Sequence, residues 1–112
     1  MEIQNLSSDS ILLQLAEVME TRRLAAPSES YVSQLLHAGQ DKILKKVIEE
    51  AGEVLMASKD GDNSHLVKEI ADLWFHTLVL LTHHGLRPED VLAELRQRQN
   101  RSGLAEKAAR QN

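Results

Sequence analysis

The sequence predicts an all-α domain, and three observations support this fold class. Apolar residues recur at the three-to-four-residue spacing of amphipathic helices, without a convincing alternating strand. Aromatic residues make up only 3% of the 112 residues, which favours aliphatic helix packing over a β-sandwich. The length suits one domain, and the 42% hydrophobic fraction is sufficient for a core. We therefore predict a single domain, residues 1–112, built as a bundle of four to five helices.

The first two helices are expected on either side of a proline. A helix capped by Ser8 or Ser10 is predicted to run to about Arg23. Pro27 disfavours helical angles in the residue before it, so this helix ends ahead of the proline. A short helix or turn is expected over residues 30–37.

Two long helices form the centre of the predicted fold. The first is expected over residues 41–59 with Asp41 as its cap, and the second over residues 64–84, ending at Gly85. The turn between them, residues 60–63, is short and rich in loop-forming residues. Such a tight connection makes the two helices antiparallel neighbours.

A further helix is expected to begin at Pro88, because proline suits the first turn of a helix. The stretch from Leu73 to Leu81 is apolar on nearly every side, which requires burial all round. A single layer of helices cannot provide this, so we predict a homodimer in which the two long helices of both chains form a four-helix core. The polar ends, residues 1–8 and 105–112, are expected to be poorly ordered.

Composition narrows the range of functions. The chain has 13 basic and 17 acidic residues, and its net charge of −4 argues against nucleic acid as a partner. The absence of Cys excludes disulfides, cysteine zinc fingers and thiol nucleophiles. No apolar run approaches the length of a membrane span, and the N-terminus lacks the basic start of a secretory signal. We expect a cytoplasmic protein without a membrane partner.

Acidic residues are concentrated in one part of the chain. Residues 47–72 hold seven acids against two lysines, which makes this window more negative than the whole chain. Glu50 with Glu53, and Glu69 with Asp72, are spaced three positions apart beside the apolar stripe of each long helix. No lysine follows any of them at the i+4 position. Antiparallel pairing of the helices would bring both pairs to one level.

Converging carboxylates repel one another, and a hard divalent cation relieves that repulsion. We therefore predict a Mg²⁺ site, with Mn²⁺ as a possible substitute, whose ligands are Glu50, Glu53, Glu69 and Asp72. Solvated acidic helix faces are the simpler alternative. A ferritin-like di-metal site would require Glu-x-x-His on two helices, a motif that the sequence lacks.

Basic residues lie just ahead of the acidic groups in the sequence, and cations beside a metal site suit a polyphosphate substrate. We predict that substrate phosphates are bound by Arg22, Lys42, Lys45 and Lys46, with Lys46 and Arg22 preferred. His76 follows Asp72 by one helical turn, and we expect it to hydrogen-bond to Asp72 or to substrate rather than to bind the metal.

The acidic motif Glu49-Glu50-x-x-Glu53, followed by Glu69-x-x-Asp72, resembles that of the all-α nucleoside triphosphate pyrophosphatases, the MazG-like superfamily. The preceding Lys45-Lys46-Val47, together with Ser30-Tyr31, more narrowly resembles the phosphoribosyl-ATP pyrophosphatase family.

This resemblance implies hydrolysis of phosphoribosyl-ATP to phosphoribosyl-AMP and pyrophosphate, the second step of histidine biosynthesis, by a dimeric Mg²⁺-dependent bundle. It implies that the metal ligands are Glu50, Glu53, Glu69 and Asp72, and it adds Glu49 to the catalytic set. Ser30, Tyr31 and His76 are candidates for contacts with substrate or for support of the ligands. Two alternatives stay open: a house-cleaning pyrophosphatase for aberrant or deoxy nucleotides, and a helical regulatory module whose acids are merely solvated.

Overall fold

The computed structural model describes residues 8–99, of which 8–10 by their backbone alone, together with Lys107 and Arg110. Within these residues the chain forms five α-helices, a single 3-10 turn and no strand, which confirms the all-α class. The elements are α1 (Ser8–Arg22), η1 (Pro27–Glu29), α2 (Tyr31–Ala38), α3 (Gln40–Asp60), α4 (Asn63–His83) and α5 (Pro88–Gln99). The expectation of poorly ordered ends falls outside the described residues, except at Ser8, Lys107 and Arg110.

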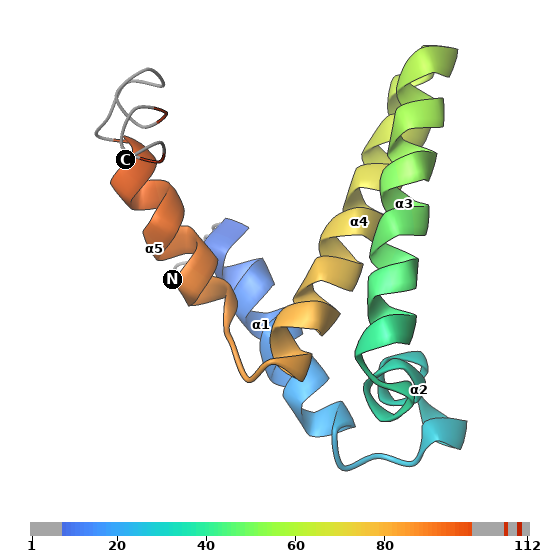
Figure 1. Ribbon diagram of the computed structural model, residues 1–112, viewed down its shortest axis with the longest axis vertical. Helices are drawn as coiled ribbons and strands as arrows, with labels where there is room; N and C mark the ends of the chain where they lie inside the picture. Colours follow the sequence, from blue (N-terminus) through green and yellow to red (C-terminus); the bar gives the residue numbers. More distant parts are fainter. Residues whose placement is uncertain (1–7, 100–106, 108–109, 111–112) are drawn as a thin grey trace, which may run out of the picture.

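The helices α3 and α4 form an antiparallel hairpin and share the most extensive contact between elements (Figure 1). The short helix α2 lies at the base of this hairpin, where it packs against both long helices. Helix α1 packs against α2, α4 and α5. The α1–α5 pair and the α3–α4 hairpin therefore diverge from a common base (Figure 1).

Polar contacts fasten the connection between α1 and α2. Arg23, just beyond α1, donates a hydrogen bond from its guanidinium to the carbonyl of Thr82 near the end of α4. Ser30 caps α2, because its hydroxyl accepts the backbone N–H of Ser33 at 3.2 Å. The fully buried hydroxyl of Ser33 donates to the carbonyl of Ala25 at 2.6 Å. These bonds fix the entry of α2 at the base of the hairpin.

The junction between α2 and α3 is tighter than the sequence suggests. Gly39 has a φ of +100°, a conformation that favours glycine. It is both the C-cap of α2 and the N-cap of α3. The expectation that Asp41 caps α3 is wrong, because the helix already begins at Gln40 without a side-chain cap. Asp41 instead lies in the first turn, where its charge complements the helix dipole.

The turn between α3 and α4 consists of two residues. Gly61, with a φ of +79°, ends α3 in the left-handed conformation. A carboxylate oxygen of Asp62 accepts the backbone N–H of His65 at 3.1 Å and so caps α4. The predicted hairpin is therefore confirmed, with each helix boundary within one residue of the predicted one.

The hydrophobic core lies at the base of the molecule, and its buried residues come from four helices: Met19, Val32, Leu35, Ile43, Leu78 and Val79. Beyond this base the hairpin carries large apolar side chains that remain exposed. Ile48 on α3 is 72% exposed, and Val67 and Trp74 on α4 are 67% and 57% exposed. Along α3 only Ile43 near the base and the small Ala57 near the turn are buried. Among the described helices, none has the length and apolar character needed to span a membrane.

Candidate active site

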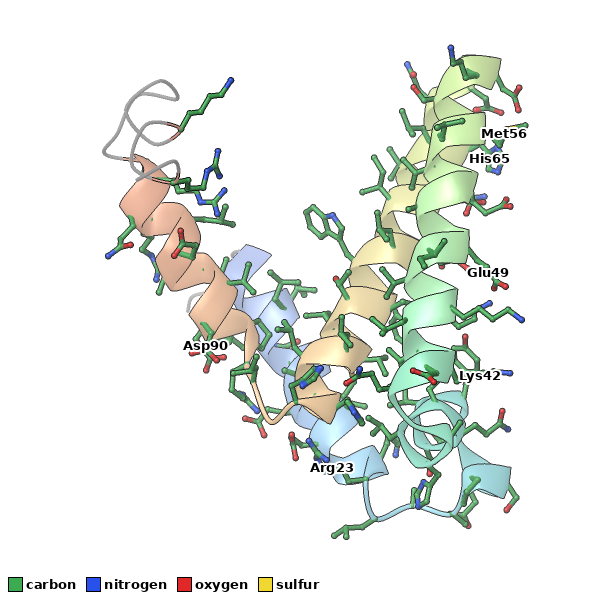
Figure 2. The ribbon with its side chains drawn as sticks, in the orientation of Figure 1. Arg23, Lys42, Glu49, Met56, His65 and Asp90 are labelled. Atoms are coloured by element: carbon green, nitrogen blue, oxygen red, sulfur yellow. The ribbon has the colours of Figure 1, made fainter. Side chains whose placement is uncertain are left out.

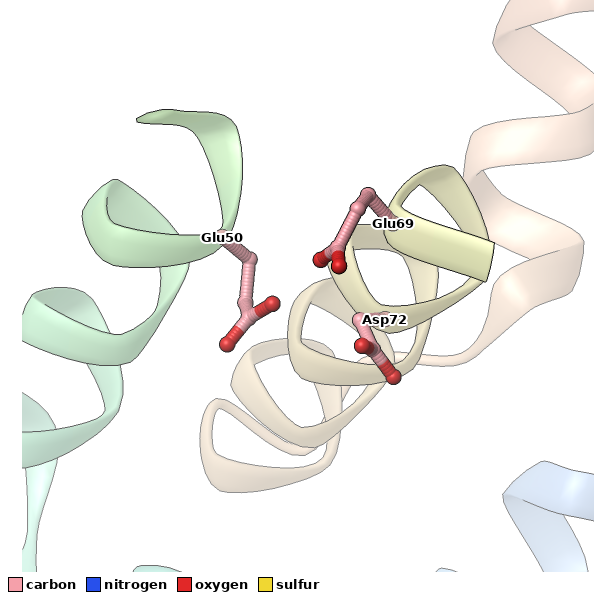
Figure 3. A group of neighbouring side chains, drawn as sticks. All are labelled: Glu50, Glu69 and Asp72. Atoms are coloured by element: carbon pink, nitrogen blue, oxygen red, sulfur yellow. The ribbon is translucent and has the colours of Figure 1, made fainter. Parts of the chain in front are cut away.

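Three carboxylates converge on the space between α3 and α4. Glu50 extends from α3 towards Glu69 and Asp72 on α4 (Figure 3). One oxygen from each carboxylate lies within 4.8 Å of the others. The side chains of Glu50 and Glu69 are only 13% and 15% exposed, whereas Asp72 is open to solvent. Carboxylates this close together repel one another, and a positive charge nearby reduces that repulsion.

The other two predicted acids occupy different positions on α3. Glu53 is exposed and is not a member of the three-carboxylate group. Glu49 is also exposed, and its carboxylate lies 3.3 Å from Nζ of Lys46. Figure 2 places Glu49 midway along α3, between Lys42 near the base and Met56 near the turn.

Lys46 links the acidic residues to the base of the hairpin. Its Nζ lies 3.3 Å from Glu49 and 3.8 Å from Glu50, so it contacts one member of the carboxylate group directly. The hydrogen bond with Glu49, helped by the nearby charges, raises the pKa of Lys46 and keeps the ammonium charged. Lys46 precedes its two partners in the sequence, at the i, i+3 and i, i+4 spacings.

A histidine that the sequence reasoning missed contacts the same site. Nε2 of His65 lies 3.0 Å from a carboxylate oxygen of Glu69, one turn further along α4. The signal that was available is the i, i+4 spacing of the two residues. His65 is half exposed, so it lies at the solvent edge of the carboxylate group.

His76 is buried beneath the site and both of its ring nitrogens have protein partners. Nδ1 lies 2.7 Å from the backbone carbonyl of Asp72, and Nε2 lies 2.8 Å from the hydroxyl of Tyr31 on α2. A carbonyl can only accept, so Nδ1 carries a proton. In the neutral ring Nε2 is then an acceptor, and Tyr31 donates its phenolic proton to it. These contacts leave His76 without a free nitrogen for a metal.

The phenol of Tyr31 lies close enough to the acidic residues to respond to their charge. Partial burial is the main factor that raises the pKa of Tyr31 above its ordinary value of 10.0. Glu50, Glu49 and Asp72 raise this pKa further, while the positive charge of Lys46 opposes them. Tyr31 is therefore a neutral hydroxyl at the boundary between α2 and the carboxylates.

A cavity of about 330 Å³ lies between α2 and α3 and adjoins the acidic group at Lys46. Its wall is formed by Tyr31, Gln34, Leu35, Ala38, Lys42 and Lys46. The predicted phosphate-binding residues Arg22 and Lys45 are exposed and are not part of this wall. The hydroxyl of Ser30 is already used as the cap of α2.

Taken together, these residues suit the binding of a metal-associated anion. Carboxylate oxygens from two helices are the donor type that hard divalent cations prefer. Ammonium groups beside them compensate the charge of phosphates. The cavity adds hydroxyl, amide and apolar surface on the same side of the hairpin.

The chain is similar to known proteins over most of its length. A family model described as phosphoribosyl-ATP pyrophosphohydrolase matches residues 12–99, which include every described site residue. A curated phosphoribosyl-ATP pyrophosphatase of Neisseria gonorrhoeae is 71% identical over 102 residues, covering 91% of this chain and 95% of the relative. The protein of the same name from Chromobacterium violaceum is 64% identical, with 89% and 93% covered. That of Bordetella parapertussis is 53% identical, with 93% of each chain covered.

Proposed function

This chain belongs to the phosphoribosyl-ATP pyrophosphohydrolase family, and we propose that it hydrolyses phosphoribosyl-ATP to phosphoribosyl-AMP and pyrophosphate. It is accordingly an enzyme, a hydrolase that acts in histidine biosynthesis. The observation that carries this conclusion is the convergence of Glu50, Glu69 and Asp72 beside Lys46, in a chain so similar to relatives of that name.

We propose Glu50, Glu69 and Asp72 as ligands of a Mg²⁺ ion, with Glu53 one turn away on α3 as a further ligand and Mn²⁺ as a substitute metal. The donor chemistry fits, since all are carboxylates and two of them are largely withdrawn from solvent. A bound ion would polarise the phosphate oxygens and lower the pKa of a water molecule.

The remaining residues neutralise the charge of the phosphates and position the attacking water. Hydrolysis of a phosphoanhydride depends mostly on placing the water and the phosphates and on stabilising the charge of the leaving group. Lys46 lies where it can neutralise a phosphate that approaches Glu50. Glu49 or Glu53 is the carboxylate that orients or deprotonates the attacking water. Arg22, Lys42 and Lys45 supply further positive charge for phosphates.

We also propose that the active form is a homodimer in which the α3–α4 hairpins of two chains form one four-helix core. The support is the large apolar surface that the single chain leaves exposed on the hairpin: Ile48, Leu55, Met56, Val67 and Trp74. Side chains of this size are seldom gathered on an open surface without a partner. A cytoplasmic location stays a prediction.

The experiment that tests the function is a turnover assay with phosphoribosyl-ATP beside ATP and dUTP, in the presence of Mg²⁺. We expect efficient hydrolysis of phosphoribosyl-ATP and much weaker hydrolysis of the other two. Preference for dUTP or another deoxynucleotide would favour the house-cleaning alternative. No turnover of any triphosphate, together with no Mg²⁺ binding by calorimetry, would favour the regulatory module.

A further inference from the structure

We infer that the cavity between α2 and α3 binds the phosphoribosyl group by which phosphoribosyl-ATP differs from ATP. Within this cavity, Lys42 binds the phosphate of the added phosphoribosyl group and Tyr31 contacts its sugar. His76 is a positioning residue for Tyr31. This inference rests on the proposed function and adds the site that would select the substrate.

Lys42 lies at the end of the cavity that is remote from the site of hydrolysis. Lys42 precedes Glu50 by eight residues, which is about 12 Å along a helix at 1.5 Å per residue. Helical side chains lean towards the N-terminus, so that of Lys42 leans away from the acidic group. Adjacent phosphates of one triphosphate are too close together to occupy both places. A second, distant phosphate on the same substrate fits this spacing.

The charges along α3 support the same assignment. The Lys46 ammonium lies 3.3 Å from Glu49 and 3.8 Å from Glu50, so it belongs to the acidic group. Among the described residues, Lys42 has no carboxylate within ion-pair distance, although it lines the cavity. The cavity therefore holds one ammonium that forms no ion pair with a described carboxylate. A phosphate monoester would compensate it.

The rest of the wall matches a sugar. With the His76 ring neutral, Tyr31 donates its proton to Nε2, so the phenol oxygen keeps lone pairs that can accept a hydrogen bond from a ribose hydroxyl. The Gln34 side chain carries both donors and acceptors, and Leu35 with Ala38 adds apolar surface for the ring. Because the Tyr31 oxygen is a hydrogen-bond acceptor, it suits a sugar hydroxyl, which can donate, better than a phosphate, which mainly accepts.

His76 holds the phenol in this orientation. It is only 6% exposed, and its own ring is fixed by the Asp72 carbonyl at 2.7 Å. Because His76 reaches the cavity only through Tyr31, loss of His76 should affect sugar binding only while the Tyr31 hydroxyl is present.

Calorimetric binding of the products tests the cavity without relying on turnover. Wild-type protein should bind phosphoribosyl-AMP at least tenfold more tightly than AMP. Lys42→Gln should lower the affinity for phosphoribosyl-AMP by about tenfold. Its affinities for AMP and for pyrophosphate should stay within twofold of those of the wild type. Lys59→Gln, in the last turn of α3, is the matched control and should change none of the three. If Lys42→Gln instead lost affinity for pyrophosphate, the leaving group rather than the phosphoribosyl group would occupy the cavity, and the inference would be overturned. Equal affinity of the wild-type protein for phosphoribosyl-AMP and AMP would also overturn it.

A double-mutant cycle tests the positioning residue. Tyr31→Phe should raise KM for phosphoribosyl-ATP several-fold with kcat within twofold, because a binding contact made equally in ground and transition states is lost. His76→Gln should raise KM in the wild-type background and add nothing in the Tyr31→Phe background. Equal effects in both backgrounds, or a lowered Tm with KM unchanged, would overturn the role of His76. Wild-type protein without turnover of phosphoribosyl-ATP would refute the proposed function, whereas these variant patterns judge the cavity alone.

Discussion

Nζ of Lys46 lies 3.8 Å from a carboxylate oxygen of Glu50, one turn further along α3. That carboxylate also faces Glu69 and Asp72 across the hairpin (Figure 3). One side chain therefore belongs both to the acidic group and to an ion pair. A phosphate drawn to a cation held by the acids would meet the Lys46 ammonium at the same place.

This arrangement predicts that Lys46→Gln separates substrate binding from metal binding. The variant should lower kcat/KM for phosphoribosyl-ATP by at least tenfold, because a charged contact to phosphate is lost. Its affinity for Mg²⁺, measured by calorimetry, should stay equal or increase, because a positive charge beside the carboxylates is gone. A parallel loss of Mg²⁺ affinity would contradict this assignment.

Removal of single carboxylate charges should inactivate the enzyme. Glu50→Gln, Glu69→Gln and Asp72→Asn should each lower turnover by about two orders of magnitude or more, since a water cannot replace the charged ligand. Glu53→Gln is expected to do the same. The Tm of the metal-free variants should not fall, because like-charge repulsion decreases. Turnover is measured at saturating Mg²⁺ and Tm by thermal denaturation.

The control for these variants is Asp60→Asn, at the exposed end of α3, which makes the same change in charge. It should keep nearly full activity. Asp62→Asn serves less well as a control, because Asp62 caps α4. If Asp60→Asn lost as much activity as the variants of Glu50, Glu69 and Asp72, general acidity rather than a defined site would explain the result.

The products should be phosphoribosyl-AMP and pyrophosphate. Attack at the anhydride between the α and β phosphates releases the last two phosphates as one unit. A phosphorus NMR time course in the absence of an added pyrophosphatase should therefore show pyrophosphate and no early orthophosphate. Direct appearance of orthophosphate would refute the proposed position of attack.

The exposed apolar surface of the hairpin predicts a dimer in solution. Light scattering at micromolar concentration should give twice the chain mass of 12.6 kDa. Ile48→Glu should shift the mass to that of a single chain, because the apolar contacts of Ile48 would be lost and a charge would be buried at the dimer interface. Val91→Glu on α5, where Val91 is 44% exposed, is the control and should leave the dimer intact. A monomeric wild type would refute the predicted four-helix core.

Tyr31 is the only tyrosine, so its phenolate absorbance reports one site. The pKa of Tyr31 is raised in the folded chain, mainly by burial, so its titration midpoint should lie above 10.0 and fall to about that value on unfolding. The resulting stabilisation is complete below the unfolded pKa and is lost as pH rises through the folded pKa. Glu50→Gln should lower the pKa of Tyr31, and Lys46→Gln should raise it. A midpoint at or below 10.0 in wild type would contradict the described surroundings of Tyr31.

Patterns within the sequence are sufficient to predict the helices and the hairpin. Apolar spacing depends on the 100° rotation per residue within one helix, and Gly61 with Asp62 marks where one helix ends and the next begins. Because the turn is only two residues long, the level of Glu50 relative to Glu69 and Asp72 follows from counting residues. The convergence of these three carboxylates can therefore be predicted from the sequence.

Contacts between side chains of different helices depend on the tertiary packing. The contact of Tyr31 with His76 joins residues 45 positions apart, and it depends on how α2 packs at the base of the hairpin. No periodicity within one helix encodes such a contact, because it depends on packing angles and side-chain rotamers. The same reason explains why Glu50 joins Glu69 and Asp72 while Glu53, on the same helix, stays apart from the group.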